Sequence, residues 1–122
     1  MIEPEVLLPM WEAHREALAH PVRTLEFPKF GRTFEDRPYQ MGIVNLSRDS
    51  SYRESIVHDV DAALYRARRM TIEGAAIVDV GAESTGATAD LLDTSAQIAS
   101  LIPVVRALCY DWIIVSAESY HT

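Results

Sequence analysis

Along most of the chain, short apolar runs alternate with longer segments in which apolar residues recur every three or four positions. The runs at 42–45, 76–80 and 112–116 are nearly all apolar, as expected of strands covered on both faces of a sheet. The longer segments, about 55–73 and 94–108, have the periodicity of helices. Evenly spaced strands with a helix between each pair are parallel and joined by right-handed crossovers. The pattern therefore predicts an α/β fold, either the start of a barrel or part of an open sheet.

Details of the two helical segments sharpen this prediction. Gly74 follows the first segment and is expected to end that helix. Pro103 lies inside the second and should kink it or divide it into two shorter helices. Five apolar residues of the second helix are expected to face the sheet: Ile98, Leu101, Ile102, Val105 and Leu108.

The first 38 residues have a different pattern. Residues 1–21 predict a short amphipathic helix with Pro9 in its first turn. Residues 24–35 alternate apolar with polar positions on either side of a Pro- and Gly-containing turn, which predicts a β-hairpin. We therefore divide the chain into an N-terminal helix and hairpin, residues 1–38, and an α/β segment, residues 39–122.

Composition and charge exclude some classes of function. The chain has 122 residues, of which 48% are hydrophobic, enough for one ordinary domain. Its formal net charge is −7, with both signs interspersed, which argues against nucleic acid as a partner. No apolar run approaches the roughly 20 residues needed to span a membrane. Glu3 and Glu5 stand where a signal peptide would be basic, so we expect a cytoplasmic location.

Polar residues gather where the predicted strands end. Asn45 ends the first strand, Asp79 lies in the second, and Glu118 follows the third, while Ser84 and Thr85 come from the loop after the second. Parallel α/β folds place their sites at these carboxyl ends. An amide, two carboxylates and hydroxyls converging there could hold a polar heterocycle and an anion or its metal. Loops are polar in any protein, however, so the same residues also fit a surface without a site.

Four stretches of the sequence resemble the dihydropteroate synthase family. They are MGIVNLSRDS at the first strand, EGAAIVDVGAEST at the second, IASLIPVVRAL in the following helix and WIIVSAESYHT at the third strand. The resemblance covers roughly residues 24–122, in order and at the family's spacing, and leaves out residues 1–21. The hairpin corresponds to the one with which such proteins close the base of their barrel.

The resemblance implies the first three βα units of a (β/α)₈ TIM barrel, in an enzyme that joins p-aminobenzoate to a pterin methyl pyrophosphate. Carried over by position, Asn45 would contact the pyrophosphate or its Mg²⁺. Asp79 and Glu118 would lie in or beside the pterin pocket. Ser84 and Thr85 would belong to the second loop, which touches the pyrophosphate and p-aminobenzoate and takes part in catalysis.

Departures from the family pattern fall in the loops. The Asp-Gly-Gly that normally ends the first loop is missing, and Gly86 stands where the family has an arginine. Glu118 replaces an aspartate. The strand cores thus match the family while the loops diverge. Four replacements relative to the family are Arg48 for proline, Ser51 for an aromatic residue, Gly86 for arginine and His121 for lysine. A synthase-like transferase is the leading interpretation. A catalytically silent pterin- or phosphate-binding paralogue and a pterin-handling methyltransferase module are the alternatives.

Three parallel strands cannot close a barrel, which needs eight. The third predicted strand has no helix after it, so one edge of the sheet would stay uncovered. We therefore expect either a longer protein or a homo-oligomer in which another chain covers that edge.

Overall fold

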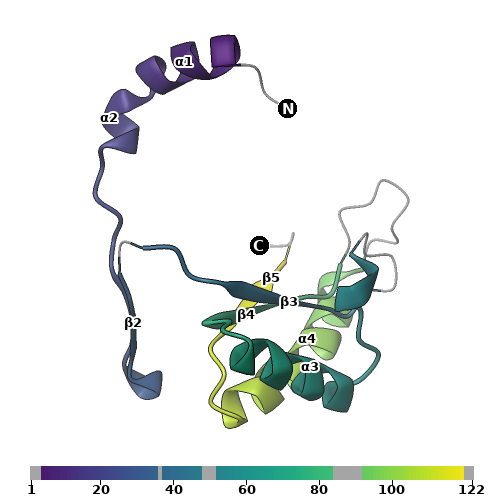
Figure 1. Cartoon of the computed structure of the whole chain (residues 1–122). Coiled ribbons are helices and arrows are strands. Elements are labelled where there is room, and N and C mark those ends of the chain that lie inside the picture. The colour runs from purple at the N-terminus through teal and green to yellow at the C-terminus, as the bar shows by residue number, and fades with distance from the viewer. Residues whose placement is uncertain (1–3, 36, 48–51, 84–91, 120–122) are drawn as a thin grey trace. The chain divides into compact units, whose positions relative to one another are not determined.

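Three parallel strands and two helices make up the larger of two compact units, residues 39–122 (Figure 1). Residues 1–38 form the other unit. The structure, a computed structural model, describes residues 4–35, 37–47, 52–83 and 92–119.

The N-terminal unit contains two helices and a hairpin. Helix α1 spans Pro4–Ala13 and α2 spans Arg15–Leu18. The single helix predicted over residues 1–21 is therefore wrong: the helix is interrupted at His14, and Pro9 lies in the middle of α1 instead of its first turn.

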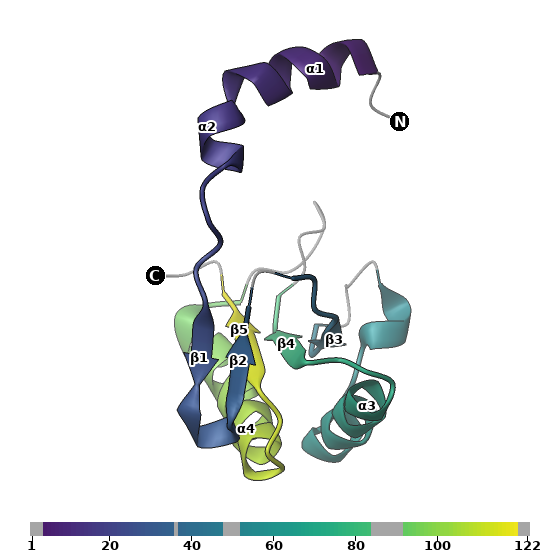
Figure 2. The ribbon, with the colours of Figure 1, turned by 60° about the vertical axis from the view of Figure 1, so that its left-hand side comes forward.

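The hairpin pairs β1 (Leu25–Phe27) with β2 (Arg32–Phe34) in antiparallel register (Figure 2). The short 3₁₀ helix η1 (Pro28–Phe30) makes the turn, and Gly31 leaves it with a left-handed φ of 59°. The rings of Phe27 and Phe34, on opposite strands, meet edge to face at 5.5 Å. This pair fixes the register of a short hairpin.

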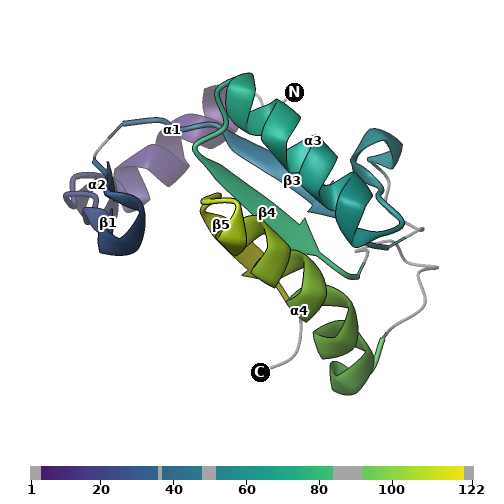
Figure 3. The ribbon, with the colours of Figure 1, turned by 90° about the horizontal axis from the view of Figure 1, so that it is seen from below.

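The larger unit contains β3 (Met41–Asn45), β4 (Ile77–Gly81) and β5 (Val115–Glu118), in the spatial order β3-β4-β5. Both neighbouring pairs are parallel. Helices α3 (Val60–Ile72) and α4 (Thr94–Tyr110) lie side by side on one face of this sheet (Figures 1 and 3). No described helix or strand of residues 39–122 covers the opposite face, where Met41 and Ile43 are exposed.

The core lies between the sheet and the two helices. Val44, Val78 and Val80 project from the strands and are fully buried. The helices contribute five buried residues to the same cluster: Ala63, Ala67, Leu101, Val104 and Leu108. Gly42 allows α3 to approach β3, because a Cβ at that position would lie 2.8 Å from the Met70 sulfur.

The inward face of helix α4 is only partly the one predicted: Leu101 and Leu108 are buried as expected, but Ile98 and Ile102 are not. Its buried residues are Gln97, Leu101, Val104 and Leu108, whereas Ile98 and Ile102 are 55% and 41% exposed. The polar residue Gln97 was not among the predicted inward residues, yet it is buried, and its side-chain oxygen accepts a hydrogen bond from the Ser119 hydroxyl. The helix is continuous through Pro103 and is not divided.

Helix α3 begins at Val60, five residues later than predicted, because Asp59 caps it. The Asp59 carboxylate accepts a hydrogen bond of 2.7 Å from the backbone N–H of Ala62. Before the cap, Arg53–Ser55 form the 3₁₀ helix η2, and Ile56 makes a bridge to Asn45. These residues are held against the edge of β3, so they cannot join the helix.

Helices α3 and α4 end in the same way. One residue just past the end of each helix adopts a left-handed backbone conformation, and the N–H groups there donate hydrogen bonds back to carbonyls of the last turn. Gly74, with φ 114°, ends α3 as predicted, and the N–H of Ala75 donates to Met70 O at 2.8 Å. At the end of α4, Trp112 takes this role with φ 60°, and the N–H of Ile113 donates to Leu108 O at 3.0 Å.

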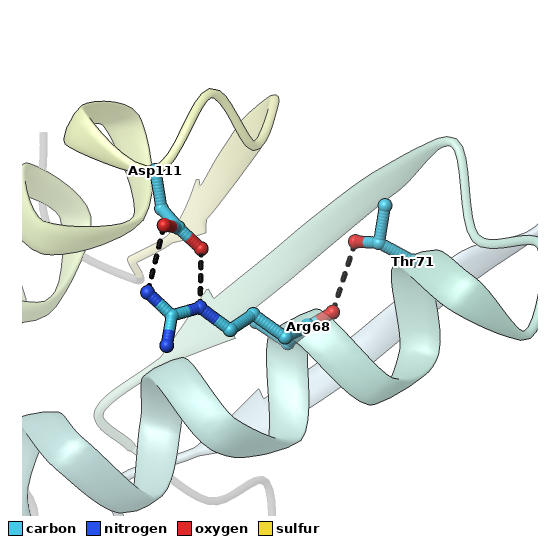
Figure 4. Close-up of polar contacts among 4 residues, drawn as sticks. Arg68, Thr71 and Asp111 are labelled. Atoms are coloured by element: carbon cyan, nitrogen blue, oxygen red, sulfur yellow. Dashed lines mark hydrogen bonds and ion pairs between the residues drawn. The ribbon is translucent and has the colours of Figure 1, made fainter.

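The end of α4 corrects the position of the third strand. Residues 112–114 complete the helix-ending turn and lead into the sheet, so β5 starts at Val115 and not at Trp112 as predicted. A bidentate ion pair from Arg68 on α3 to Asp111 joins this turn to α3, with N···O distances of 2.7 and 2.8 Å (Figure 4). No helix in the described part of the chain is long and apolar enough to cross a membrane.

Candidate functional site

The register of the sheet determines which side chains share its uncovered face. Val44, Val78 and Val80 point into the helix layer, and side chains alternate along a strand, so their neighbours point the other way. Asp79 pairs with Ile43 on one side and Ser116 on the other. One step closer to the carboxyl ends, Gly81 pairs with Asn45 and Glu118. We term this group the rim: Asn45, Asp79, Gly81, Ser116 and Glu118.

Gly81 is the centre of the rim. A Cβ at this position would lie 3.4 Å from Asn45 Oδ1 and 3.3 Å from Glu118 Oε2. The Asn45 and Glu118 oxygens are therefore no farther apart than these two distances added together. They lie on either side of a residue that has no side chain. Because Gly81 carries no side chain, an amide oxygen and a carboxylate from the two neighbouring strands converge over the central strand.

The side chain of Asn45 is held from the outer edge of β3. Its Nδ2 donates a hydrogen bond of 2.5 Å to the hydroxyl of Ser55, which is fully buried. The Ser55 hydroxyl in turn donates to Tyr52 O at 2.6 Å. The backbone reinforces this contact, because the N–H of Val57 donates to Asn45 O at 2.8 Å. Asn45 is thus fixed by both its side chain and its backbone.

Two buried polar residues support the rim from the side of α4. Glu83 accepts a hydrogen bond of 2.7 Å from the N–H of Leu92, just before the helix. Gln97, in the second turn of α4, accepts one of 2.9 Å from the hydroxyl of Ser119. The first contact joins the beginning and the end of the connection between β4 and α4. The second ties the end of β5 to α4, because Ser119 directly follows Glu118.

Sequence reasoning placed three of the rim residues, Asn45, Asp79 and Glu118, and the structure brings all three to one face. It missed Gly81, although the parity of β4 puts that residue on the same face as Asp79. It also missed Ser55 and Gln97, for which the sequence carries no signal. Ser84 and Thr85 lie outside the described residues.

The chemistry of the rim is that of an acceptor site. Two carboxylates and an amide oxygen can accept hydrogen bonds from the N–H groups of a heterocycle or bind a hard cation. Among the described residues no group of three His, Cys, Asp or Glu side chains could hold a metal ion. Mg²⁺ needs no such cage, since it keeps several waters and takes one or two protein oxygens with substrate phosphates. Asn45 Oδ1 and the carboxylate beside it fit that requirement.

Comparison with known proteins identifies the class to which this fold and rim belong. The family of pterin binding enzymes matches residues 41–122, and the chain belongs to that family. Among curated proteins it is similar to the dihydropteroate synthase of Clostridium beijerinckii, at 34% identity over 86 residues, covering 70% of this chain and 32% of the relative. The synthase of Haemophilus influenzae is 37% identical over 71 residues, covering 58% and 26%.

Solved structures agree in fold. The Yersinia pestis dihydropteroate synthase in a sulfonamide drug complex superposes with a TM-score of 0.71 at 31% identity, covering 81% of this chain and 36% of that one. The Burkholderia cenocepacia synthase complexed with 7,8-dihydropteroate gives 0.59 at 35% identity, covering 83% and 32%. The α/β fold of this chain is therefore shared with the matched part of these dihydropteroate synthases. The chain spans about a quarter to a third of the length of the curated relatives it matches.

Proposed function

We propose that this chain supplies the pterin-binding side of a dihydropteroate synthase-type transferase in folate biosynthesis, with its three strands as the first three of a (β/α)₈ barrel. The observation that carries the proposal is the row Asn45, Gly81 and Glu118 with Asp79 one step below it, all at the carboxyl ends of parallel strands. Family membership over residues 41–122 supports it. So do the ligands of two similar structures, 7,8-dihydropteroate in one and 4-aminobenzoic acid in the other.

In the proposed reaction, the amine nitrogen of p-aminobenzoate forms a bond to the pterin methylene carbon as the carbon–oxygen bond to pyrophosphate breaks. The amine loses a proton, and pyrophosphate leaves with the bonding electrons. No protein nucleophile is required, so the residues act by orientation and electrostatics. Asp79 and Glu118 would accept hydrogen bonds from N–H groups of the pterin ring. The Ser84 and Thr85 hydroxyls would donate hydrogen bonds to the pyrophosphate.

Asn45 would hold Mg²⁺ through Oδ1. When bound, the ion would neutralise charge on the pyrophosphate and so favour its departure. The chain's own residues would present that oxygen beside the carboxylates of Asp79 and Glu118. Gly81 permits this, because it places no side chain between the Asn45 oxygen and Glu118. The requirement for Mg²⁺, the homo-oligomeric state and the cytoplasmic location stay predictions.

The test is release of pyrophosphate from the pterin pyrophosphate in the presence of p-aminobenzoate and Mg²⁺. We expect release that depends on p-aminobenzoate and falls at least tenfold in Asp79→Asn. Asp61→Asn, on the exposed start of α3, is the matched control and should leave the rate unchanged. Release that Asp79→Asn does not affect would contradict the proposal.

A second function is favoured by a specific observation, the glycine at position 86 where the family has an arginine. Without this cation the chain could bind pterin pyrophosphate and fail to turn it over, as a silent paralogue with a regulatory or structural role. Saturable binding without pyrophosphate release would select this alternative.

A further inference from the structure

The amide of Asn45 can point in either of two ways, with oxygen or with nitrogen toward the rim. The two atoms have nearly the same size, so the choice is decided by hydrogen-bond partners. The partner that decides it is Ser55, whose hydroxyl is fully buried between Asn45 and the backbone carbonyl of Tyr52.

The hydrogen that Ser55 carries and the carbonyl of Tyr52 decide which atom of Asn45 faces Ser55. The Tyr52 carbonyl can only accept, so the Ser55 hydroxyl, which lies 2.6 Å away, must give its one hydrogen to it. The Ser55 oxygen is then left with lone pairs on the side of Asn45, 2.5 Å away. The atom of Asn45 that meets them must be a donor, which is Nδ2. Turning the amide over would set two acceptor oxygens against each other in a buried place.

The consequence appears on the other branch of the amide. With Nδ2 directed to Ser55, Oδ1 lies 3.4 Å from the position that a Gly81 Cβ would occupy, on the side of Glu118. We propose that Ser55 is a positioning residue for the rim: it fixes the Asn45 amide so that an oxygen, and not an NH₂ group, faces the space over Gly81. A cation is attracted to the first arrangement and repelled by the second.

The segment that carries Ser55 is held firmly enough for this role. Residues 53–55 form η2, Ile56 bridges to Asn45, and the N–H of Val57 donates to Asn45 O at 2.8 Å. The 52–57 segment is thus attached to β3 at the same residue whose side chain it orients. Residues that orient a metal ligand from behind typically change metal affinity by 10- to 100-fold when removed.

The inference rests on the proposed function for the identity of the cation, and its experiment separates the two. The probe is Mn²⁺, which binds oxygen ligands as Mg²⁺ does. It is titrated into the full chain, and binding is followed by the electron paramagnetic resonance signal of the ion. Ser55→Ala should weaken Mn²⁺ binding at least about tenfold. Ser55→Thr, which keeps the hydroxyl, should recover most of it. Thr71→Ala, which removes a hydroxyl bonded to Ala67 O on α3 (Figure 4), should not change it.

A second readout does not involve the metal. In ¹⁵N spectra, the side-chain NH₂ hydrogens of Asn45 should exchange with water at least tenfold faster in Ser55→Ala than in the wild type, and slowly again in Ser55→Thr. Equal exchange in the wild type and Ser55→Ala would overturn the inference, as would unchanged Mn²⁺ affinity in a Ser55→Ala protein that is folded by circular dichroism. If the wild type binds no Mn²⁺, the proposed metal role fails, and the exchange rates alone decide whether Ser55 orients Asn45.

Discussion

Replacing Gly81 by alanine should damage binding far more than folding. The new Cβ would lie 3.3 Å from Glu118 Oε2 and 3.4 Å from Asn45 Oδ1 in the space between them. The backbone of Gly81 is outside the left-handed region, so alanine adds no backbone strain. In the free protein, shifts of a few tenths of an ångström relieve the contact. The free energy of unfolding should therefore fall by less than the roughly 1–3 kcal/mol that overpacking a tight core costs.

The bound state has no such freedom, because a ligand that holds both oxygens prevents them from moving apart. The full overpacking cost of about 1–3 kcal/mol then falls on binding, which corresponds to roughly 5- to 150-fold in affinity. The assay is calorimetric titration of Gly81→Ala with pterin pyrophosphate and Mg²⁺, together with a urea denaturation curve for the same protein.

Gly42→Ala is the matched control, because the two glycines lie on opposite faces of the sheet. Its Cβ would meet the Met70 side chain at 2.8 Å in the helix layer, so its cost of about 1–3 kcal/mol should appear in the unfolding curve and not in the affinity. If Gly81→Ala bound as tightly as the wild type, the space over Gly81 would not be the ligand site. The reasoning would also fail if both glycine variants lost stability equally.

Three further predictions address the helix end, acid stability and turnover. Trp112→Gly should raise the free energy of unfolding by up to about 1 kcal/mol in urea, because glycine removes the left-handed backbone cost, whereas Trp112→Ala, which keeps a Cβ and therefore that cost, should not raise it. Arg68 lowers the pKa of Asp111, chiefly by its hydrogen bond, so their pair stabilises fully above the ordinary carboxyl pKa and is lost as pH falls through the lowered value. Thermal melts of wild type and Asp111→Asn should therefore differ at pH 6 and converge in acid; a constant difference would contradict this. Synthase turnover should be low without a cation at position 86, and Gly86→Arg should raise pyrophosphate release, since such a contact contributes about 2.7–4 kcal/mol, or roughly 10²–10³ in rate. No gain in Gly86→Arg would refute that cause.

The alternation of strands and helices, and the face that the rim shares, could be predicted from sequence because both depend on local periodicity. Side chains two apart in a strand point the same way, so parity alone groups Asp79 with the neighbouring strand ends. The ends of the helices show where this reasoning stops. Gly74 indicates a left-handed turn, because glycine favours that conformation. Trp112 makes the same turn although tryptophan rarely adopts it, so the sequence gives no sign of the turn and the third strand is predicted to start too early.

Long-range polar contacts were the other part that sequence could not supply. Gln97 is buried on α4, where its side-chain oxygen accepts a hydrogen bond from Ser119, far along the chain, and hydrophobic periodicity gives no reason to place a polar residue on an inward face. Ser55 looked like the start of a helix, and only its hydrogen bond to Asn45 shows that it belongs to the edge of β3. Both residues act through partners that are distant in sequence, which no local pattern encodes.

The most direct test of the central claim is calorimetric titration of the protein with pterin pyrophosphate in the presence of Mg²⁺. If the rim is the pterin site, the wild type and Asp61→Asn will show saturable binding to one site per chain. Asp79→Asn, which turns one acceptor of the rim into a partial donor, will bind at least tenfold more weakly. Binding that is equal in all three proteins, or absent from the wild type, would contradict the claim that these strand ends form a pterin site.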